Sequence, residues 1–157
     1  MIGEKERYHG VALARLVQRA EQPITITSWN SVSRSSYVLN DRSALYIKYS
    51  TNRLSPWPFV FSADHWAELD DLSEVVEKIW IVLVCGQEGV ISIDWGTVKT
   101  RLMHPDDTDG FSLLASKRPS QKFRLRGSGA TPILIAENHY PDIILREIAG
   151  TATVPPS

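Results

Sequence analysis

The chain has 157 residues, of which 43% are hydrophobic and 22% are charged, the balance of one ordinary globular domain. Its 17 Lys and Arg and 18 Asp and Glu residues give a formal net charge of −1, which excludes a uniformly basic nucleic-acid binder, so any anion site must be local. The longest apolar run, residues 79–85, is far too short to span a bilayer. The residues that follow Met1 lack the apolar segment of a signal peptide, so we expect a cytoplasmic protein without a membrane partner.

The first part of the chain predicts one helix followed by three strands. Apolar residues recur at helical spacing over residues 8–20, and Pro23 ends the segment. β-Branched and aromatic residues then favour extended structure over residues 24–29, 34–39 and 44–50. We therefore expect an amphipathic opening helix and a three-stranded unit.

The second and third of these strands are expected to form a hairpin. Their connection, residues 40–43, contains Asn and Asp, which readily adopt tight-turn backbone geometry. With the turn at the centre of this stretch, Tyr46 lies opposite Tyr37. Lys48 then lies opposite Ser35, and neither strand offers an acidic side chain on the face that carries the lysine.

A second helix is predicted after a short extended segment at residues 59–61. Ser62 is suited to cap the start of this helix. Four apolar residues mark the buried side of the helix: Trp66, Leu69, Leu72 and Val76. Its acidic residues are expected to face water: Asp64, Glu68, Asp70 and Asp71.

The middle of the chain predicts the central strand of a sheet. Residues 79–85 are apolar throughout, which is typical of a strand buried on both faces. A turn leads into a second strand over 90–94, and a short helix is expected over 95–103. Cys85 lies in the apolar run, so we expect a buried, inert thiol rather than a nucleophile.

The C-terminal part predicts further short strands. Turn residues separate extended segments at 111–115, 121–126 and 132–136, which indicates a small β-rich C-terminal extension over residues 111–148. Residues 149–157 are expected to be a disordered tail.

These elements together predict a mixed α/β fold. An αβββαβ-like core covers about residues 8–103, and the β-rich extension follows it. One domain is expected to span residues 1–148.

The order helix, three strands, helix, strand over residues 8–85 resembles the αβββαβ core of the restriction-endonuclease-like, or PD-(D/E)XK, superfamily. Lys48 stands where that superfamily carries its lysine. The resemblance covers about half of the chain. It implies a protein associated with DNA or RNA, either a divergent metal-dependent nuclease with Lys48 as a catalytic residue or a catalytically silent binder.

The superfamily's motif needs an acid two residues before the lysine and another acid nearby, which together hold Mg²⁺. Tyr46 occupies the first of these positions. Glu4, Glu6 or Glu21 could supply one carboxylate, which is a poor Mg²⁺ site. Mg²⁺ is therefore expected only if the chain is a nuclease, and because the four histidines are scattered singly, no metal-binding residues are predicted.

Two interpretations stay open for Lys48 and the loop that follows it. Lys48 either covers apolar surface with its stem and reaches water with its ammonium, or contacts a phosphate. Arg53 would add a second cation, and Trp57 would provide a ring on which a base stacks. In the other interpretation Trp57 plugs the edge of the core.

The densest positive cluster of the chain falls on the predicted strand at 121–126. Period-two alternation puts Lys122, Arg124 and Arg126 on one face and the intervening apolar residues on the other. Such a row either binds nucleic-acid phosphates without sequence preference or belongs to a solvated outer strand whose charges discourage edge pairing. Both interpretations stay open.

A second class of function is a non-catalytic protein–protein interaction module, which pairs with another protein or with a copy of itself. Its surface would use the five tryptophans, since tryptophan is a favoured interface anchor. Core packing is the alternative, notably for Trp66 and Trp80. The five are Trp29, Trp57, Trp66, Trp80 and Trp95.

Overall fold

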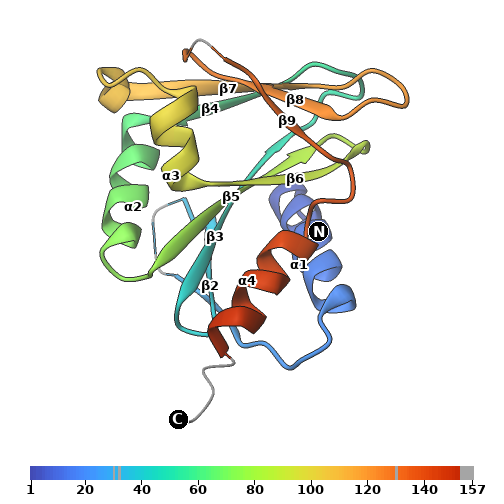
Figure 1. Ribbon diagram of the computed structural model, residues 1–157, viewed down its shortest axis with the longest axis vertical. Coiled ribbons are helices and arrows are strands. Elements are labelled where there is room, and N and C mark those ends of the chain that lie inside the picture. Colours follow the sequence, from blue (N-terminus) through green and yellow to red (C-terminus); the bar gives the residue numbers. More distant parts are fainter. Residues whose placement is uncertain (30, 32, 130, 153–157) are drawn as a thin grey trace.

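The structure is a computed structural model that describes residues 1–157 except residues 30, 32, 130 and 153–157. It confirms the mixed α/β class, with helices packed around two β-sheets (Figure 1). In chain order the elements are α1 (Glu4–Arg19), β1 (Ile26–Ser28), β2 (Ser36–Leu39), β3 (Ser43–Ser50), β4 (Trp57–Ser62), α2 (Ala63–Ser73), β5 (Lys78–Cys85), β6 (Gly89–Asp94), α3 (Trp95–Thr97), the π-helical turn η1 (Val98–Leu102), the 3₁₀ turn η2 (Asp107–Asp109), β7 (Gly110–Ser116), β8 (Phe123–Arg126), β9 (Ile133–Ile135) and α4 (Asp142–Ala152).

The first sheet, called sheet A, has the strand order β1-β2-β3-β5-β6. Strands β1, β2 and β3 pair antiparallel, and β5 then lies parallel to β3. The predicted order of helix, three strands, helix and strand is therefore present. Strand β4, which falls between β3 and α2 in the chain, leaves this sheet and joins the other.

Sheet A is buried on both faces, because the side chains of β3 and β5 alternate between two core clusters. Tyr46 and Ile81 point toward sheet B and α2, whereas Ile47 and Val82 point toward α1 and α4. Every residue from Ile79 to Cys85 is buried, which confirms the predicted central strand. The sheet is thus the middle layer of the molecule (Figure 1).

The second sheet, called sheet B, has the strand order β4-β7-β8-β9, all antiparallel. It forms the upper layer in Figure 1. Its inner face packs on sheet A through Phe59, Phe61, Phe123 and Leu125. The predicted strands of the C-terminal part are confirmed, but β8 lies between β7 and β9, so it is not the edge strand that one of the two interpretations of its cations assumed.

The register of the β2–β3 hairpin differs by one residue from the predicted one. Tyr46 pairs with Ser36, and Tyr37 pairs with Leu45. The reason is a three-residue turn, in which Asn40 has φ 50° and the next residue φ 58°. A shift of one residue moves a side chain to the opposite face, so Tyr37 points toward α1 instead of sharing a face with Tyr46.

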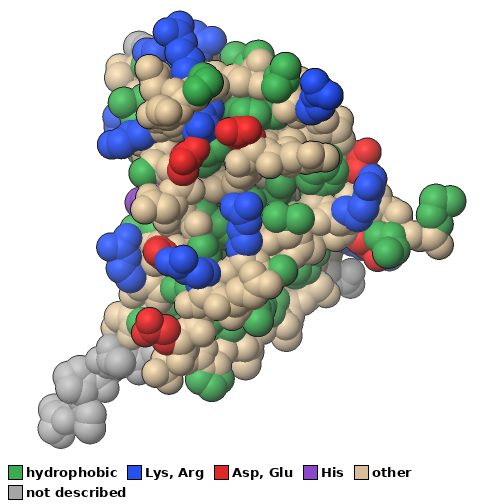
Figure 2. All heavy atoms as spheres, turned by 90° about the vertical axis from the view of Figure 1, so that its right-hand side faces the viewer, with side chains coloured by type: hydrophobic (Ala, Val, Ile, Leu, Met, Phe, Trp, Pro, Cys, Tyr) green, Lys and Arg blue, Asp and Glu red, His purple; other side chains and the backbone are tan. Residues whose placement is uncertain are grey.

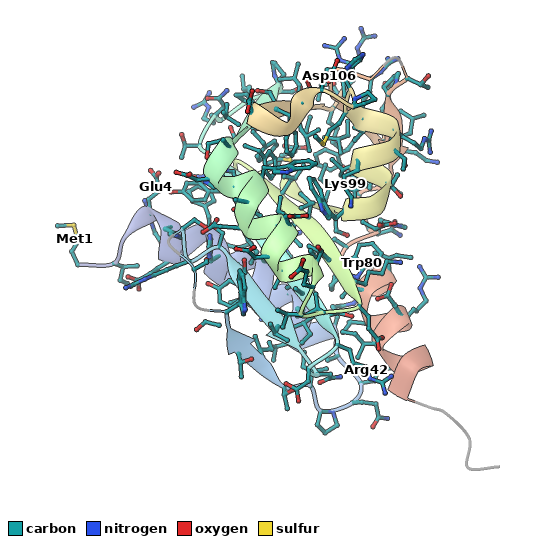
Figure 3. All side chains as sticks on the ribbon, turned by 90° about the vertical axis from the view of Figure 1, so that its left-hand side faces the viewer. Met1, Glu4, Arg42, Trp80, Lys99 and Asp106 are labelled. Atoms are coloured by element: carbon teal, nitrogen blue, oxygen red, sulfur yellow. The ribbon has the colours of Figure 1, made fainter. Side chains whose placement is uncertain are left out.

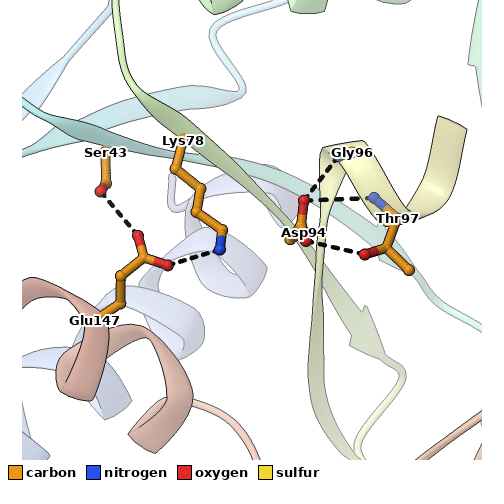
Figure 4. A network of polar contacts seen from close by, with 6 residues as sticks. All are labelled: Ser43, Lys78, Asp94, Gly96, Thr97 and Glu147. Atoms are coloured by element: carbon orange, nitrogen blue, oxygen red, sulfur yellow. Dashed lines mark hydrogen bonds and ion pairs between the residues drawn. The ribbon is translucent and has the colours of Figure 1, made fainter. Parts of the chain in front are cut away.

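The C-terminal end is helical where the sequence predicted the end of a β-rich extension and the start of a disordered tail. Helix α4 packs Ile144 and Ile148 against sheet A beside α1. Glu147 of α4 binds Lys78 at 2.9 Å and accepts a hydrogen bond from Ser43 at 3.4 Å (Figure 4). The predicted tail is therefore wrong for residues 149–152, and its remaining residues, 153–157, lie outside the described residues.

The opening helix also begins earlier than predicted, at Glu4 rather than at residue 8. Its first turn is polar, so the apolar spacing used for the prediction misses it. Within the described ranges, no helix combines the length and the apolar character needed to cross a membrane.

Candidate functional site

Lys48 lies on the face of β3 that carries Tyr46, close to the start of α2. Its ammonium sits 5.3 Å from the centre of the Phe61 ring and 3.5 Å from Nδ1 of His65. Ser62 caps α2 as predicted, and His65 completes a capping box, because its Nδ1 accepts a hydrogen bond from the Ser62 backbone N–H at 3.0 Å. A neutral His65 therefore carries its proton on Nε2.

Glu68 lies one turn beyond His65 and contradicts the prediction that it faces water. Its carboxylate accepts hydrogen bonds from Tyr46 Oη at 2.7 Å, from Ser33 Oγ at 2.6 Å and from Ser33 N–H at 3.0 Å. Lys5 at the start of α1 donates to the Ser33 carbonyl. Figure 3 shows the start of α1, marked by Glu4, beside the start of α2. Four elements therefore come together around this carboxylate: α1, the β1–β2 loop, β3 and α2.

Burial lowers the pKa of each of the three basic side chains in this cluster, Lys5, Lys48 and His65. Burial lowers the pKa of Lys48, the charge of Lys5 lowers it further, and Glu68 partly offsets both effects. Burial and the nearby Lys48 lower the pKa of His65. Burial alone would raise the pKa of Glu68, but the hydrogen bonds from Ser33 and Tyr46 outweigh it and leave the pKa below its usual value. Two lysines thus share one ionised carboxylate, which leaves the cluster positive.

The cluster is poorly suited to hold Mg²⁺ through protein carboxylates. Glu68 already accepts three hydrogen bonds, and Tyr46, which stands two residues before Lys48, acts as a donor to it. Across the part of the chain that the structure describes, no three His, Cys, Asp or Glu side chains group as metal ligands would. The arrangement instead provides two ammonium groups, those of Lys5 and Lys48, near the exposed N-terminus of α2.

The loop between β3 and β4 places its two predicted site residues differently. Arg53 is exposed, whereas Trp57 is only 2% exposed and packs against Phe123 with ring centres 6.0 Å apart. The Trp57 indole N–H donates to the carbonyl of Asn52 at 2.9 Å. Trp57 therefore plugs the core, and the prediction that a base stacks on it is wrong because both ring faces are covered.

The cation row on β8 is arranged as the alternation predicts. Lys122, Arg124 and Arg126 are exposed, and the residues between them are buried. No described residue forms a side-chain hydrogen bond or an ion pair with any of the three. Figure 2 shows Lys and Arg side chains at the upper end of the molecule, where sheet B lies. Three cations therefore lie side by side in this row without partners among the described residues.

Neighbouring charges do not neutralise this row. Lys117 binds Glu137 at 2.6 Å and Glu88 at 3.5 Å, and its side chain is 5% exposed. Asp107 accepts hydrogen bonds from Ser128 Oγ and from the His104 backbone N–H. These acids are engaged elsewhere, so the row keeps its positive charge.

The five tryptophans pack against the hydrophobic core to different extents. Trp57, Trp80 and Trp95 are at most 5% exposed. Trp29 and Trp66 are partly buried and pack against the core between the two sheets. Core packing therefore accounts for Trp57, Trp80 and Trp95, and the interaction module stays a prediction, for which Trp29 and Trp66 keep partly exposed rings.

Sequence reasoning missed Lys5, Ser33, His65 and Glu68 as members of one cluster. Only the Ser62-to-His65 spacing of a capping box carried a local signal for any of them. Ser33 and Glu68 are 35 residues apart, and no pattern in the sequence joins them.

Comparison with known proteins identifies no relative, since no protein-family model, no curated protein and no solved structure matches the chain. Function is therefore inferred from the geometry of the chain's own residues.

Proposed function

We propose that the chain binds nucleic acid through the outer face of sheet B and contacts the phosphate backbone rather than specific bases. The observation that carries this proposal is the row of Lys122, Arg124 and Arg126, exposed and without an acidic partner among the described residues. Cations in such a row release counterions from phosphates, so binding is salt-dependent and independent of sequence.

The composition of the whole face supports the same proposal. The four strands of sheet B contain no Asp or Glu. Arg124 pairs with Leu134 on β9, which is 63% exposed, and Val60 on β4 is 64% exposed. A face of cations and exposed apolar side chains suits a single strand, whose phosphates and unpaired bases are both accessible.

The Lys48 cluster supports a silent binder more than a nuclease. The restriction-endonuclease-like core remains part of this proposal, since the element order of that core is present. However, Tyr46 donates to Glu68 where a metal-binding acid would be needed, and Glu68 already has three donors. In this proposal Lys48 and the exposed Arg53 add phosphate contacts outside the main row.

The proposal is tested by fluorescence anisotropy with labelled single- and double-stranded DNA and RNA. Counting only the three phosphate contacts of the row, with a slope of about −0.7 per contact, raising NaCl from about 50 to about 200 mM weakens single-strand binding roughly twentyfold. The Arg124→Ala/Arg126→Ala protein is expected to lose about two-thirds of that salt dependence and at least about tenfold in affinity at low salt.

Arg146→Ala is the matched control, because this exposed arginine lies on α4, on the opposite side of sheet A from sheet B. It is expected to bind as the unchanged chain does. Equal affinities in all three proteins would refute the proposed face. A gel of the same samples with Mn²⁺ tests the other form of the proposal: cleavage that Lys48→Ala abolishes would establish a divergent nuclease.

A further inference from the structure

A cavity of about 340 Å³ lies between α1 and the β5–β6 hairpin, on the side of sheet A opposite to sheet B. A volume of this size is at the lower end of the range for small-molecule sites. None of the residues discussed above as a nucleic-acid contact lines it.

On the α1 side of the cavity, an apolar side chain lies between two arginines. Arg7, Val11 and Arg15 follow one another at intervals of four residues, so they lie along one line of α1. The helix rises about 1.5 Å per residue, which separates the two arginines by about 12 Å at the backbone. Val11 between them is 42% exposed, an open apolar contact at the centre of the wall.

The opposite wall is apolar and has little side-chain bulk. Val84 and Val90 are buried beneath the cavity, at 2% and 1% exposure. Gly86 and Gly89 also line the cavity with backbone alone, since a Cβ atom on either would be directed toward Trp57 or Phe123 on the sheet B side and not into the cavity. The φ of Gly86 is +54°, and a Cβ atom there would lie 2.3 Å from the Asn52 carbonyl oxygen, so no other residue fits without displacing the backbone.

The charge of the cavity has one sign. Arg7 and Arg15 line it, and among the residues that the structure describes no Asp or Glu does. Neither guanidinium forms a side-chain hydrogen bond or ion pair with any residue that the structure describes. The neighbouring Glu88 is directed to Lys117, at 3.5 Å. On the side of the molecule seen in Figure 2, Lys and Arg side chains lie among apolar ones over the middle of the face, with few acidic groups between them.

We propose that this cavity binds a small organic anion with an apolar body. Its carboxylate or phosphate group pairs with Arg7 or Arg15, whose planar guanidinium can hold two oxygens at once. Its apolar body covers Val11, Val84 and Val90. The amide of Gln87 at the rim offers a further hydrogen bond.

The probe for this site is anilinonaphthalene sulfonate, a fluorescent anion with an aromatic body, titrated into the full chain at neutral pH and low salt. Saturable binding with a stoichiometry of one is expected. Arg7→Ala and Arg15→Ala should each weaken it about three- to tenfold, as expected for the loss of one charge-assisted contact. Val11→Glu, which places a carboxylate in the cavity at an exposed position, should weaken it by at least about tenfold.

Arg146→Ala removes the same charge outside the cavity and is expected to bind the probe as the unchanged chain does. Circular dichroism of each variant shows whether the fold is kept. Displacement of the probe by adenosine monophosphate identifies a phosphate as the preferred group, and displacement by octanoate identifies a carboxylate. No saturable binding, an affinity in the three cavity variants equal to that of the unchanged chain, or displacement by neither compound would overturn the proposal. Nucleic-acid binding by sheet B is measured separately and does not depend on this result.

Discussion

Replacing Glu68 by Ala removes the acceptor that joins the β1–β2 loop, β3 and α2. The Tyr46 hydroxyl, on a residue with 0% exposure, loses a hydrogen bond of 2.7 Å to a charged group. An unpaired buried hydroxyl costs about 1–3 kcal/mol, and the two bonds from Ser33, which water partly replaces, add about 1 kcal/mol. We therefore expect the free energy of unfolding to fall by about 2–4 kcal/mol, which corresponds to a Tm lower by roughly 6–12 °C.

Urea denaturation of Tyr46→Phe, Glu68→Ala and the double variant measures this interaction directly. The expected coupling energy is about 1–2 kcal/mol, because the two side chains share one hydrogen bond to an ionised group. Asp71→Ala is the control, an exposed acid on the same helix, and is expected to change stability by less than about 0.5 kcal/mol. A coupling energy near zero, or an equal loss in Asp71→Ala, would refute the role given to Glu68.

The same coupling should depend on pH. The pKa of Glu68 is lowered in the folded chain from its usual 4.5, so its ionised form stabilises the fold above that value. This contribution is lost as the pH falls through the lowered pKa of the folded state. Coupling that is constant down to about pH 5 and weakens below it is the expected result.

Three further predictions concern the core. Gly86→Ala is expected to lower the free energy of unfolding by about 2–4 kcal/mol in urea denaturation, since the positive φ disfavours a side chain and the new Cβ would meet the Asn52 carbonyl. Cys85 is fully buried, and burial raises the pKa of its thiol to about 12. A thiol-reactive dye should therefore label it only as fast as the chain unfolds, and faster labelling would contradict its burial. Tyr140→Phe removes a buried hydrogen bond of 2.6 Å to the Ala12 carbonyl and should cost about 1–2 kcal/mol by thermal denaturation; an unchanged Tm would show that this bond does not help hold α4 against α1.

The sequence predicted the elements whose burial repeats at short range. The continuous apolar run at residues 79–85 became the doubly covered β5, and the alternation at 122–126 became the half-exposed β8. It predicted the cap of α2 at Ser62 as well, because capping depends on residues within one turn. The sequence did not predict α4. The apolar residues of this helix recur at helical spacing, but they follow several short strands and turns, so the segment was assigned to the β-rich extension.

The candidate sites depended on contacts that the sequence could not reveal. The β2–β3 turn has three residues instead of the predicted four, and this difference decided which face carries Tyr37, so that Tyr37 meets His9 at 2.8 Å instead of lying beside Tyr46. Ser33 reaches Glu68 across 35 residues of chain.

Local patterns thus determined which segments form helices and strands, and which cations share the face of β8, because periodicity and capping act over a few residues. Only the tertiary structure decided that Trp57 is a core residue, that Glu68 is an anchor rather than a solvated acid, and that Arg7 and Arg15 flank a cavity. The physical reason is that these roles depend on what packs against each side chain, and the packing partners come from distant parts of the chain.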